Sequence, residues 1–298
     1  MKTQSNTYAG QSVLAKWSGT AYVLPSFVIL LMIAILPILA SAYLSFTQFD
    51  VLSSPEWIGT VNYQRIYSDQ AFWDALKHTI IFTVFTVPLQ IFIPMVLADK
   101  LARLKTRWLS GLVRSVLFVP VVASLILVGT VWQYILAGGV GFFNVILEGL
   151  GFSSLNFLGD PTLAMGSVIV VAAWKNIGYF LVLFYAGVLD IPKERYEAAS
   201  VDGANVVQQF FYITIPGLRK VTQLSILLAT IWSFQAFDLI YAMTKGGPGG
   251  ATSTLVMAIY DAGFKLFEMG YASAMAMVLL LLIICFSLIQ KLVNRKED

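Results

Sequence analysis

The sequence contains few of the residues that carry out chemistry. Its 298 residues include one cysteine, Cys285, and one histidine, His78, which lie far apart in the chain. Metal and nucleophilic sites need clustered histidine, cysteine and carboxylate side chains. The sequence therefore argues against an intramembrane metalloprotease or a similar enzyme, and its single cysteine excludes a disulfide within the chain.

A nucleotide-binding loop is also missing. The phosphate-binding pattern has two glycines separated by four residues and followed by Lys and Ser or Thr, and the pair Lys105-Thr106 has no such glycines before it. We therefore expect this chain to bind no cofactor. If ATP drives the protein, another chain must bind it. No cleavable signal peptide is visible either, because the first apolar run is too long for one.

Charged residues are scarce and apolar residues abundant. Only 12% of residues are charged, 58% are hydrophobic and the mean hydropathy is +0.79, which is typical of a membrane protein. A helix that crosses about 30 Å of hydrocarbon needs about 20 apolar residues. Six segments meet this test and form a predicted membrane domain over 21–293, with spans at about 21–46, 79–98, 115–137, 162–189, 221–241 and 269–290.

The predicted spans are helical, because backbone groups in lipid must be satisfied within the segment and the alternating pattern of a barrel strand is absent. Basic residues indicate their orientation, since Lys and Arg resist translocation. Only Arg65, Lys77, Lys245 and Lys265 flank one set of span ends, whereas most of the 19 basic residues flank the other. We therefore expect cytoplasmic tails at 1–20 and 294–298. The net charge of +3 follows from this topology and indicates no nucleic-acid partner.

A polar loop, 190–218, separates the fourth and fifth predicted spans. Pro192 suits the first turn of a short helix over Lys193–Ser200, and Gly203 can adopt the left-handed conformation that ends it. A second short helix is expected over Ala204–Tyr212, before Pro216. Such a loop has two interpretations, an ordinary solvated cytoplasmic loop or a docking site for a partner.

Three motifs resemble one family. Glu197-Ala198-Ala199, Gly203 and Ile213-Thr214-Ile215-Pro216 resemble the EAA loop of ABC importer permeases, although Ile215 stands where leucine is usual. The segment Leu239–Pro248, with Thr252 and Leu255 after it, resembles the carbohydrate-uptake branch of maltose and glycerol-phosphate permeases. The segment Phe72–Thr79 does so too, with His78 in place of asparagine.

The resemblance implies a type I ABC importer permease fold with a cytoplasmic coupling helix, in a bacterial or archaeal cytoplasmic membrane. It implies a transport subunit without catalytic activity that moves a sugar or oligosaccharide through the lipid bilayer. The implied partners are a second homologous permease in a heterodimer, two ATPase subunits that bind ATP and Mg, and an extracytoplasmic solute-binding protein. The implied coupling residues are Glu197, Ala198, Ala199, Asp202 and Gly203, although Glu197 could instead only stabilise its own helix.

Lys175 stands at the centre of the predicted fourth span, where a charge costs at least about 2.5 kcal/mol, so it should face protein or a water-filled path. We expect it to line a substrate path with Asn176, Tyr179 and Asp238; the alternatives are an ion pair with Asp238 or an ammonium that reaches one interface. Asp238 itself could be a structural or gate residue. Aromatic residues such as Trp232 are expected to pack or to lie at the interface.

The turn formed by Gly246, Gly247 and Pro248 lies on the outer side and is a candidate contact for the solute-binding protein, unless it is a plain turn. The outer segment 50–77 is a second candidate. Two other functions remain open at this point. One is an ABC importer for glycerol phosphate or another non-sugar solute, and the other is an ion-coupled secondary carrier.

Overall fold

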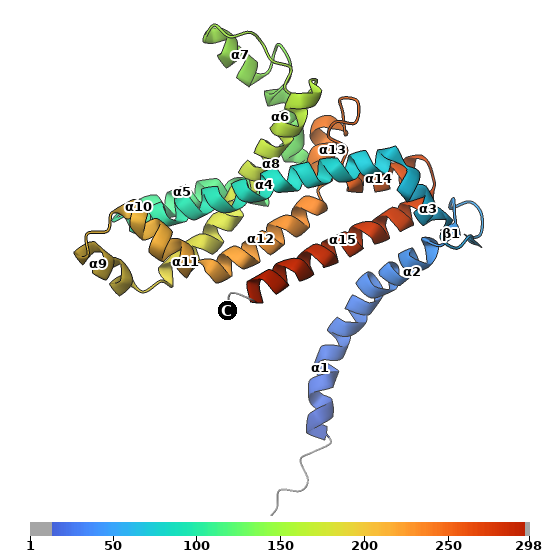
Figure 1. Cartoon of the computed structure of the whole chain (residues 1–298), viewed down its shortest axis with the longest axis horizontal. Helices are drawn as coiled ribbons and strands as arrows, with labels where there is room; N and C mark the ends of the chain where they lie inside the picture. The colour runs from blue at the N-terminus through green and yellow to red at the C-terminus, as the bar shows by residue number, and fades with distance from the viewer. Residues whose placement is uncertain (1–13, 296–298) are drawn as a thin grey trace, which may run out of the picture.

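The computed structural model describes residues 14–295, and most of them are helical (Figure 1). The strands in this range are β1 (Thr47–Gln48) and β2 (Glu56–Trp57), a short antiparallel pair in which Thr47 faces Trp57. The predicted all-α fold is confirmed. The predicted tails at 1–20 and 294–298 lie largely outside the described residues.

Four segments are long and apolar enough to cross a membrane without a sharp bend. They are Tyr22–Leu44, Gln70–Arg103, Pro161–Leu189 and Met269–Val293. The first comprises most of α1 (Leu14–Leu30), the π-helix η1 (Leu31–Ile35) and α2 (Leu36–Leu44); the others are α4 (Gln70–Arg103), α8 (Pro161–Leu189) and α15 (Met269–Arg295).

Local sequence explains where two of these helices begin. The side chain of Asp69 accepts a hydrogen bond from the backbone N–H of Ala71 and caps α4 at 2.9 Å. Asp160 caps α8 in the same way, because its side chain accepts a hydrogen bond from the N–H of Thr162 at 2.8 Å. Pro161 occupies the first turn of α8, where a backbone N–H has no partner within the helix, so the missing N–H of proline costs no hydrogen bond.

The predicted third and fifth spans are not single helices. The third is α5 (Arg107–Val122) and α6 (Leu125–Ile135), bent by 100°, and the fifth is α12 (Arg219–Phe234) and α13 (Asp238–Thr244), bent by 48°. Extended backbone at Ala123 and Ser124 makes the first break. At the second break the Thr254 hydroxyl donates to the carbonyl of Ala236 at 2.9 Å, which satisfies a group that the helix no longer pairs. If each bent pair is one span, the chain has up to six.

The helices α4 and α8 form the centre of the bundle, α12 runs beside α4, and α15 runs beside α12 (Figure 1). A buried cluster that includes Phe180, Phe184 and Leu218 joins α4, α8 and the start of α12. Gly178 of α8 lets α5 approach closely, because a Cβ there would overlap the carbonyl oxygen of Leu117. The first helical segment points away from this bundle (Figure 1).

Shorter helices connect these elements. They are α3 (Val61–Ser68), α7 (Phe142–Gly149), α9 (Lys193–Val201), α10 (Val206–Gln209), η2 (Phe210–Thr214), α11 (Ile215–Gly217), α14 (Leu255–Tyr260) and η3 (Asp261–Lys265). The helices α9 and α10 lie at one end of the bundle, and α3 and the β1–β2 pair lie at the opposite end (Figure 1).

Candidate functional site

A cavity of about 420 Å³ lies where α4, α8 and the two helix breaks meet. Aromatic and aliphatic side chains make up most of its wall, and a few polar side chains interrupt them. The lining residues are Phe82, Gln90, Val121, Leu125, Ala172, Lys175, Asn176, Tyr179, Trp232, Ser233, Gln235, Ala236, Phe237, Asp238, Leu239 and Ile240. An apolar pocket with few polar groups is typical of a small-molecule site.

The structure brings all four predicted path residues to this cavity. Lys175, Asn176 and Tyr179 lie on α8, and Asp238 lies at the start of α13, directly after the break, instead of within a continuous span. Lys175 is 9% exposed, and its ammonium donates a long hydrogen bond of 3.4 Å to the carbonyl of Val121. No carboxylate among the described residues forms an ion pair with it, so the alternative of a pair with Asp238 is wrong for this structure.

Residues that the sequence analysis did not single out complete the cavity. Gln90 is 2% exposed; its amide N–H donates to the carbonyl of Ala172 at 3.2 Å, while its side-chain oxygen has no partner. A polar residue within an apolar span was the available signal. Trp232 packs as expected, with its ring centroid 5.0 Å from that of Tyr179, and it also forms part of the cavity wall.

The loop between α8 and α12 contains the other predicted site. The helix α9 begins at Lys193 as predicted and ends at Val201, and Gly203 has φ of +81°, which confirms its left-handed conformation. The N–H of Ala204 bonds to the carbonyl of Ala199 at 2.8 Å and the N–H of Gly203 to that of Ser200 at 3.1 Å, a Schellman end.

The predicted coupling residues lie together on or next to α9. Glu197, Ala198, Asp202 and Gly203 are exposed, and Ala199 is half-buried. No residue of α9 is buried, which leaves the helix open to a partner.

The second helix of the loop is longer than predicted. Asn205 caps it with a reciprocal pair of bonds to Gln208, and helical structure then continues through η2 and α11 to Gly217. Pro216 lies in α11, and only Leu218 separates the end of α11 at Gly217 from the start of α12.

The turn at Gly246, Gly247 and Pro248 is held from within the chain. The Thr252 hydroxyl is buried, donates to the carbonyl of Gly247 at 2.8 Å and lies 2.7 Å from the hydroxyl of Thr244. These contacts account for the turn as structure, and its contact with a binding protein stays a prediction. The neighbouring N–H of Leu255 donates to the hydroxyl of Thr79 at 2.8 Å, so two of the motifs that resemble the permeases lie in contact.

Residues 91–298 match the family described as binding-protein-dependent transport system inner membrane component. The chain belongs to this family. The probable ABC transporter permease protein YurN of Bacillus subtilis is 35% identical over 276 residues, 90% of this chain and 93% of that protein. The trehalose/maltose transport system permease protein MalF of Thermococcus litoralis is 32% identical over 280 residues, 93% of each chain.

The permease is also similar to solved structures. A chain in the crystal structure of a bacterial alginate ABC transporter, in complex with alginate pentasaccharide-bound periplasmic protein, matches it with a TM-score of 0.86 at 18% identity over 97% of both chains. At this identity the likeness shows the fold alone. The fold is that of a type I ABC importer permease, as the resemblance of the motifs implied.

No three His, Cys, Asp or Glu side chains cluster in the part that the structure describes. The cavity combines aromatic walls with the polar groups of Lys175, Asn176 and Asp238. The exposed loop helix lies at one end of the bundle, separated from the cavity along α4 and α8 (Figure 1).

Proposed function

We propose that this permease is the membrane-spanning subunit of an ATP-driven importer for a sugar or oligosaccharide that an extracytoplasmic solute-binding protein delivers. The cavity carries the proposal. It combines the rings of Tyr179, Trp232 and Phe237 with the polar groups of Asn176 and Gln90. Sugar hydroxyls need hydrogen-bond partners, while the C–H faces of the ring pack against aromatic and apolar walls.

The relatives support the same class of solute. One is named as a permease for trehalose and maltose, and the structural neighbour belongs to an alginate ABC transporter. In this proposal Lys175, Asn176, Tyr179 and Asp238 lie along the substrate path. Membership of a binding-protein-dependent family leaves the ion-coupled carrier without support.

One observation favours an acidic solute as the second candidate. The Lys175 ammonium has no carboxylate partner among the described residues and lines the cavity. A buried cation without an anionic partner suits an anionic group. Glycerol phosphate or an acidic sugar would supply that group, whereas a neutral sugar would leave Lys175 as a hydrogen-bond donor only.

The exposed surfaces support the proposed partners. The apolar segment Tyr22–Leu44 has 0% of its most apolar window buried, and its α1 end points away from the bundle while α2 contacts α15, which suits packing against lipid and a second, similar permease (Figure 1). The exposed α9 suits docking on a separate ATPase subunit, two of which would bind ATP and Mg. Gly246, Gly247 and Pro248 remain the proposed contact of the binding protein, and both termini are proposed to be cytoplasmic.

Purification from the native membrane tests this assembly. The chain would be tagged, extracted in mild detergent and analysed by mass spectrometry with everything that accompanies it. We expect a second permease in equal amount and an ATPase in twice the amount of each. A homo-oligomer without ATP hydrolysis, reproduced in several detergents, would contradict the proposal.

A further inference from the structure

An ion pair lies in the last turns of α4, next to the loop that contains α9. Asp99 and Arg103 lie one turn apart, and the guanidinium donates from Nε to Oδ2 at 2.8 Å and from Nη2 to Oδ1 at 3.0 Å. Asp99 is only 4% exposed, so its carboxylate is shielded from water, whereas the Arg103 side chain keeps 29% of its surface accessible. Hydrogen bonds between charged groups are strong and directional, and a two-point contact also fixes their orientation.

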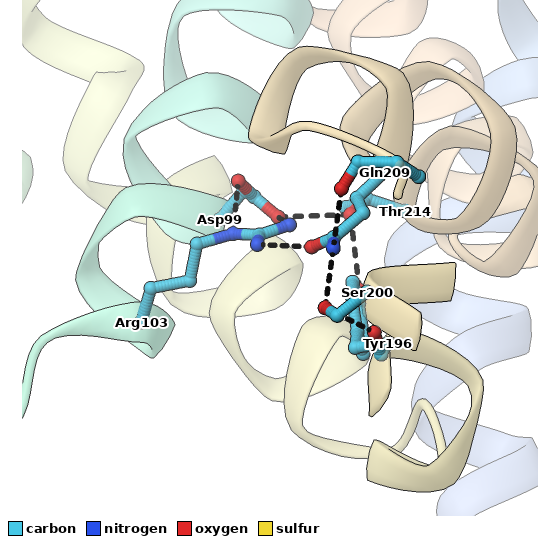
Figure 2. Close-up of polar contacts among 7 residues, drawn as sticks. Asp99, Arg103, Tyr196, Ser200, Gln209 and Thr214 are labelled. Atoms are coloured by element: carbon cyan, nitrogen blue, oxygen red, sulfur yellow. Dashed lines mark hydrogen bonds and ion pairs between the residues drawn. The ribbon is translucent and has the colours of Figure 1, made fainter. Parts of the chain in front are cut away.

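The same two side chains bind the loop that holds α9 (Figure 2). Arg103 Nη1 donates to the side-chain oxygen of Gln209 at 2.8 Å, and the Gln209 amide donates in turn to the hydroxyl of Ser200 at 2.9 Å and the carbonyl of Ala204 at 3.2 Å. One arginine thus reaches the end of α9 through a single intermediate side chain.

A second branch starts at Asp99. The Thr214 hydroxyl donates to Asp99 Oδ1 at 2.8 Å and lies 3.0 Å from the Tyr196 hydroxyl, which must therefore donate to it (Figure 2). The Arg103 guanidinium also lies 5.1 Å from the centre of the Tyr196 ring. We use the name polar clamp for this connected set, which consists of Asp99, Arg103, Tyr196, Ser200, Gln209 and Thr214.

Little else attaches α9 to the bundle. The helix has no buried residue, and its apolar contact is the half-buried ring of Tyr196, which is itself part of the polar clamp. Elements of a soluble bundle are normally held by a buried apolar face. Here two hydrogen bonds take over much of that role, one that Ser200 accepts from Gln209 and one that Tyr196 donates to Thr214.

The polar clamp leads to the cavity along two helices. Gln90, which lines the cavity, lies about two and a half turns from Asp99 in the same unbroken helix α4. Thr214 is the last residue of η2, which α11 and Leu218 join to α12, and the opposite end of α12 carries Trp232 and Ser233 into the cavity wall. Both connections from the polar clamp to the cavity are therefore helical except at Leu218.

We infer that the polar clamp is the joint through which movement of α9 reaches the cavity, with Asp99 and Arg103 as its positioning residues. This rests on the proposed function, in which an ATPase moves α9. Stability alone is a weak explanation for the ion pair, because a pair whose cation reaches water adds little stability and apolar side chains of similar volume often replace an ion pair without loss. An apolar replacement would lack the directional bonds that tie α4 to Gln209 and Thr214.

The test compares Asp99→Leu, Arg103→Met and the double variant in the full complex with its partners in proteoliposomes. ATP hydrolysis and solute uptake are measured together, and the co-purified ATPase is quantified. Arg103→Met leaves the buried Asp99 carboxylate without its charged partner and can fail to accumulate, whereas Asp99→Leu leaves the partly exposed Arg103 in reach of water. The double variant leaves no unpaired charge and is the decisive one.

We expect the double variant to capture as much ATPase as the wild type and to hydrolyse ATP, but to transport at least tenfold less solute for each ATP. Asp261→Leu with Lys265→Met is the matched control, because it removes another ion pair with the same spacing, 2.7 Å long and exposed. The control should keep the wild-type ratio.

If the double variant transports as much solute for each ATP hydrolysed as the wild type, the inference is overturned. The polar clamp would then only stabilise the fold. The wild type separates this failure from that of the proposed function. If the clamp alone is wrong, the wild type still couples solute to hydrolysis; if the proposed function is wrong, the wild type shows no coupling and the inference falls with it.

Discussion

At the scale of residues, Lys175 is the most informative position. It lies at the centre of a helix of 29 residues, and its ammonium is placed at a cavity instead of in an ion pair. The sequence alone predicted that such a charge must face protein or water, because insertion into lipid is costly. The choice between a solute path and a structural pair needed the packing of α5 and α13 around α8, which no local pattern encodes.

Replacing Lys175 with methionine keeps the length of the side chain and removes its charge. A hydrogen bond to a charged group contributes about 1.5–3 kcal/mol, so we expect solute uptake to fall roughly ten- to hundredfold with the complex intact. Uptake by proteoliposomes measures this, with Lys265→Met, on an exposed side chain away from the cavity, as the control. Loss of the assembled complex would favour a structural role for Lys175.

Two glycines of α8 offer a second test at this scale. A Cβ at Gly178 would overlap the backbone of α5, whereas a Cβ at Gly166 of the same helix would meet nothing within 4 Å. Gly178→Ala should therefore destabilise the permease by about 1–3 kcal/mol through overpacking. Gly166→Ala should stabilise it by up to about 1 kcal/mol through helix propensity. Unfolding in detergent, followed by circular dichroism, should shift in opposite directions; equal shifts would contradict the close packing of α5 on α8.

At the scale of elements, the loop around α9 was the most predictable part of the chain. Its signals are local: a proline before the first turn and Gly203 at the end, where the structure has the left-handed backbone. The helix breaks were not predictable in this way. Ala123 and Ser124 are ordinary residues, and the carbonyl freed at Ala236 is satisfied by the distant Thr254. The length of each apolar run can be read from the sequence, but the contacts that bend the helix within that run cannot.

The exposure of α9 leads to a prediction about docking. Glu197 is exposed on a helix without buried residues, so Glu197→Arg should leave the permease folded and inserted. If Glu197 meets a basic surface of the ATPase, Glu197→Arg places two positive charges together at that interface, and like charges at an interface repel. The amount of ATPase that co-purifies should then fall at least tenfold. Glu148→Arg on α7, at a different end of the molecule, is the control (Figure 1). Unchanged capture and transport in Glu197→Arg would remove the docking assignment.

At the scale of the whole molecule, the excess of Lys and Arg at one set of span ends predicts the orientation. A chain with up to six spans has both termini on one side if all six cross. Tags fused to Met1 and to Asp298 should both resist labelling from outside intact cells and become accessible after permeabilisation. A tag inserted at Gly249, in the proposed outer turn, should be labelled in intact cells. External labelling of either terminal tag would contradict the proposed topology.

The central claim concerns the whole assembly, and ATP-driven uptake tests it most directly. The complex would be reconstituted in proteoliposomes with its binding protein, and labelled maltose, trehalose and longer oligosaccharides would be compared with glycerol 3-phosphate. The account predicts uptake of at least one sugar that requires ATP and the binding protein. Uptake of glycerol 3-phosphate alone would favour the acidic solute, and sugar uptake that continues without ATP would contradict the account.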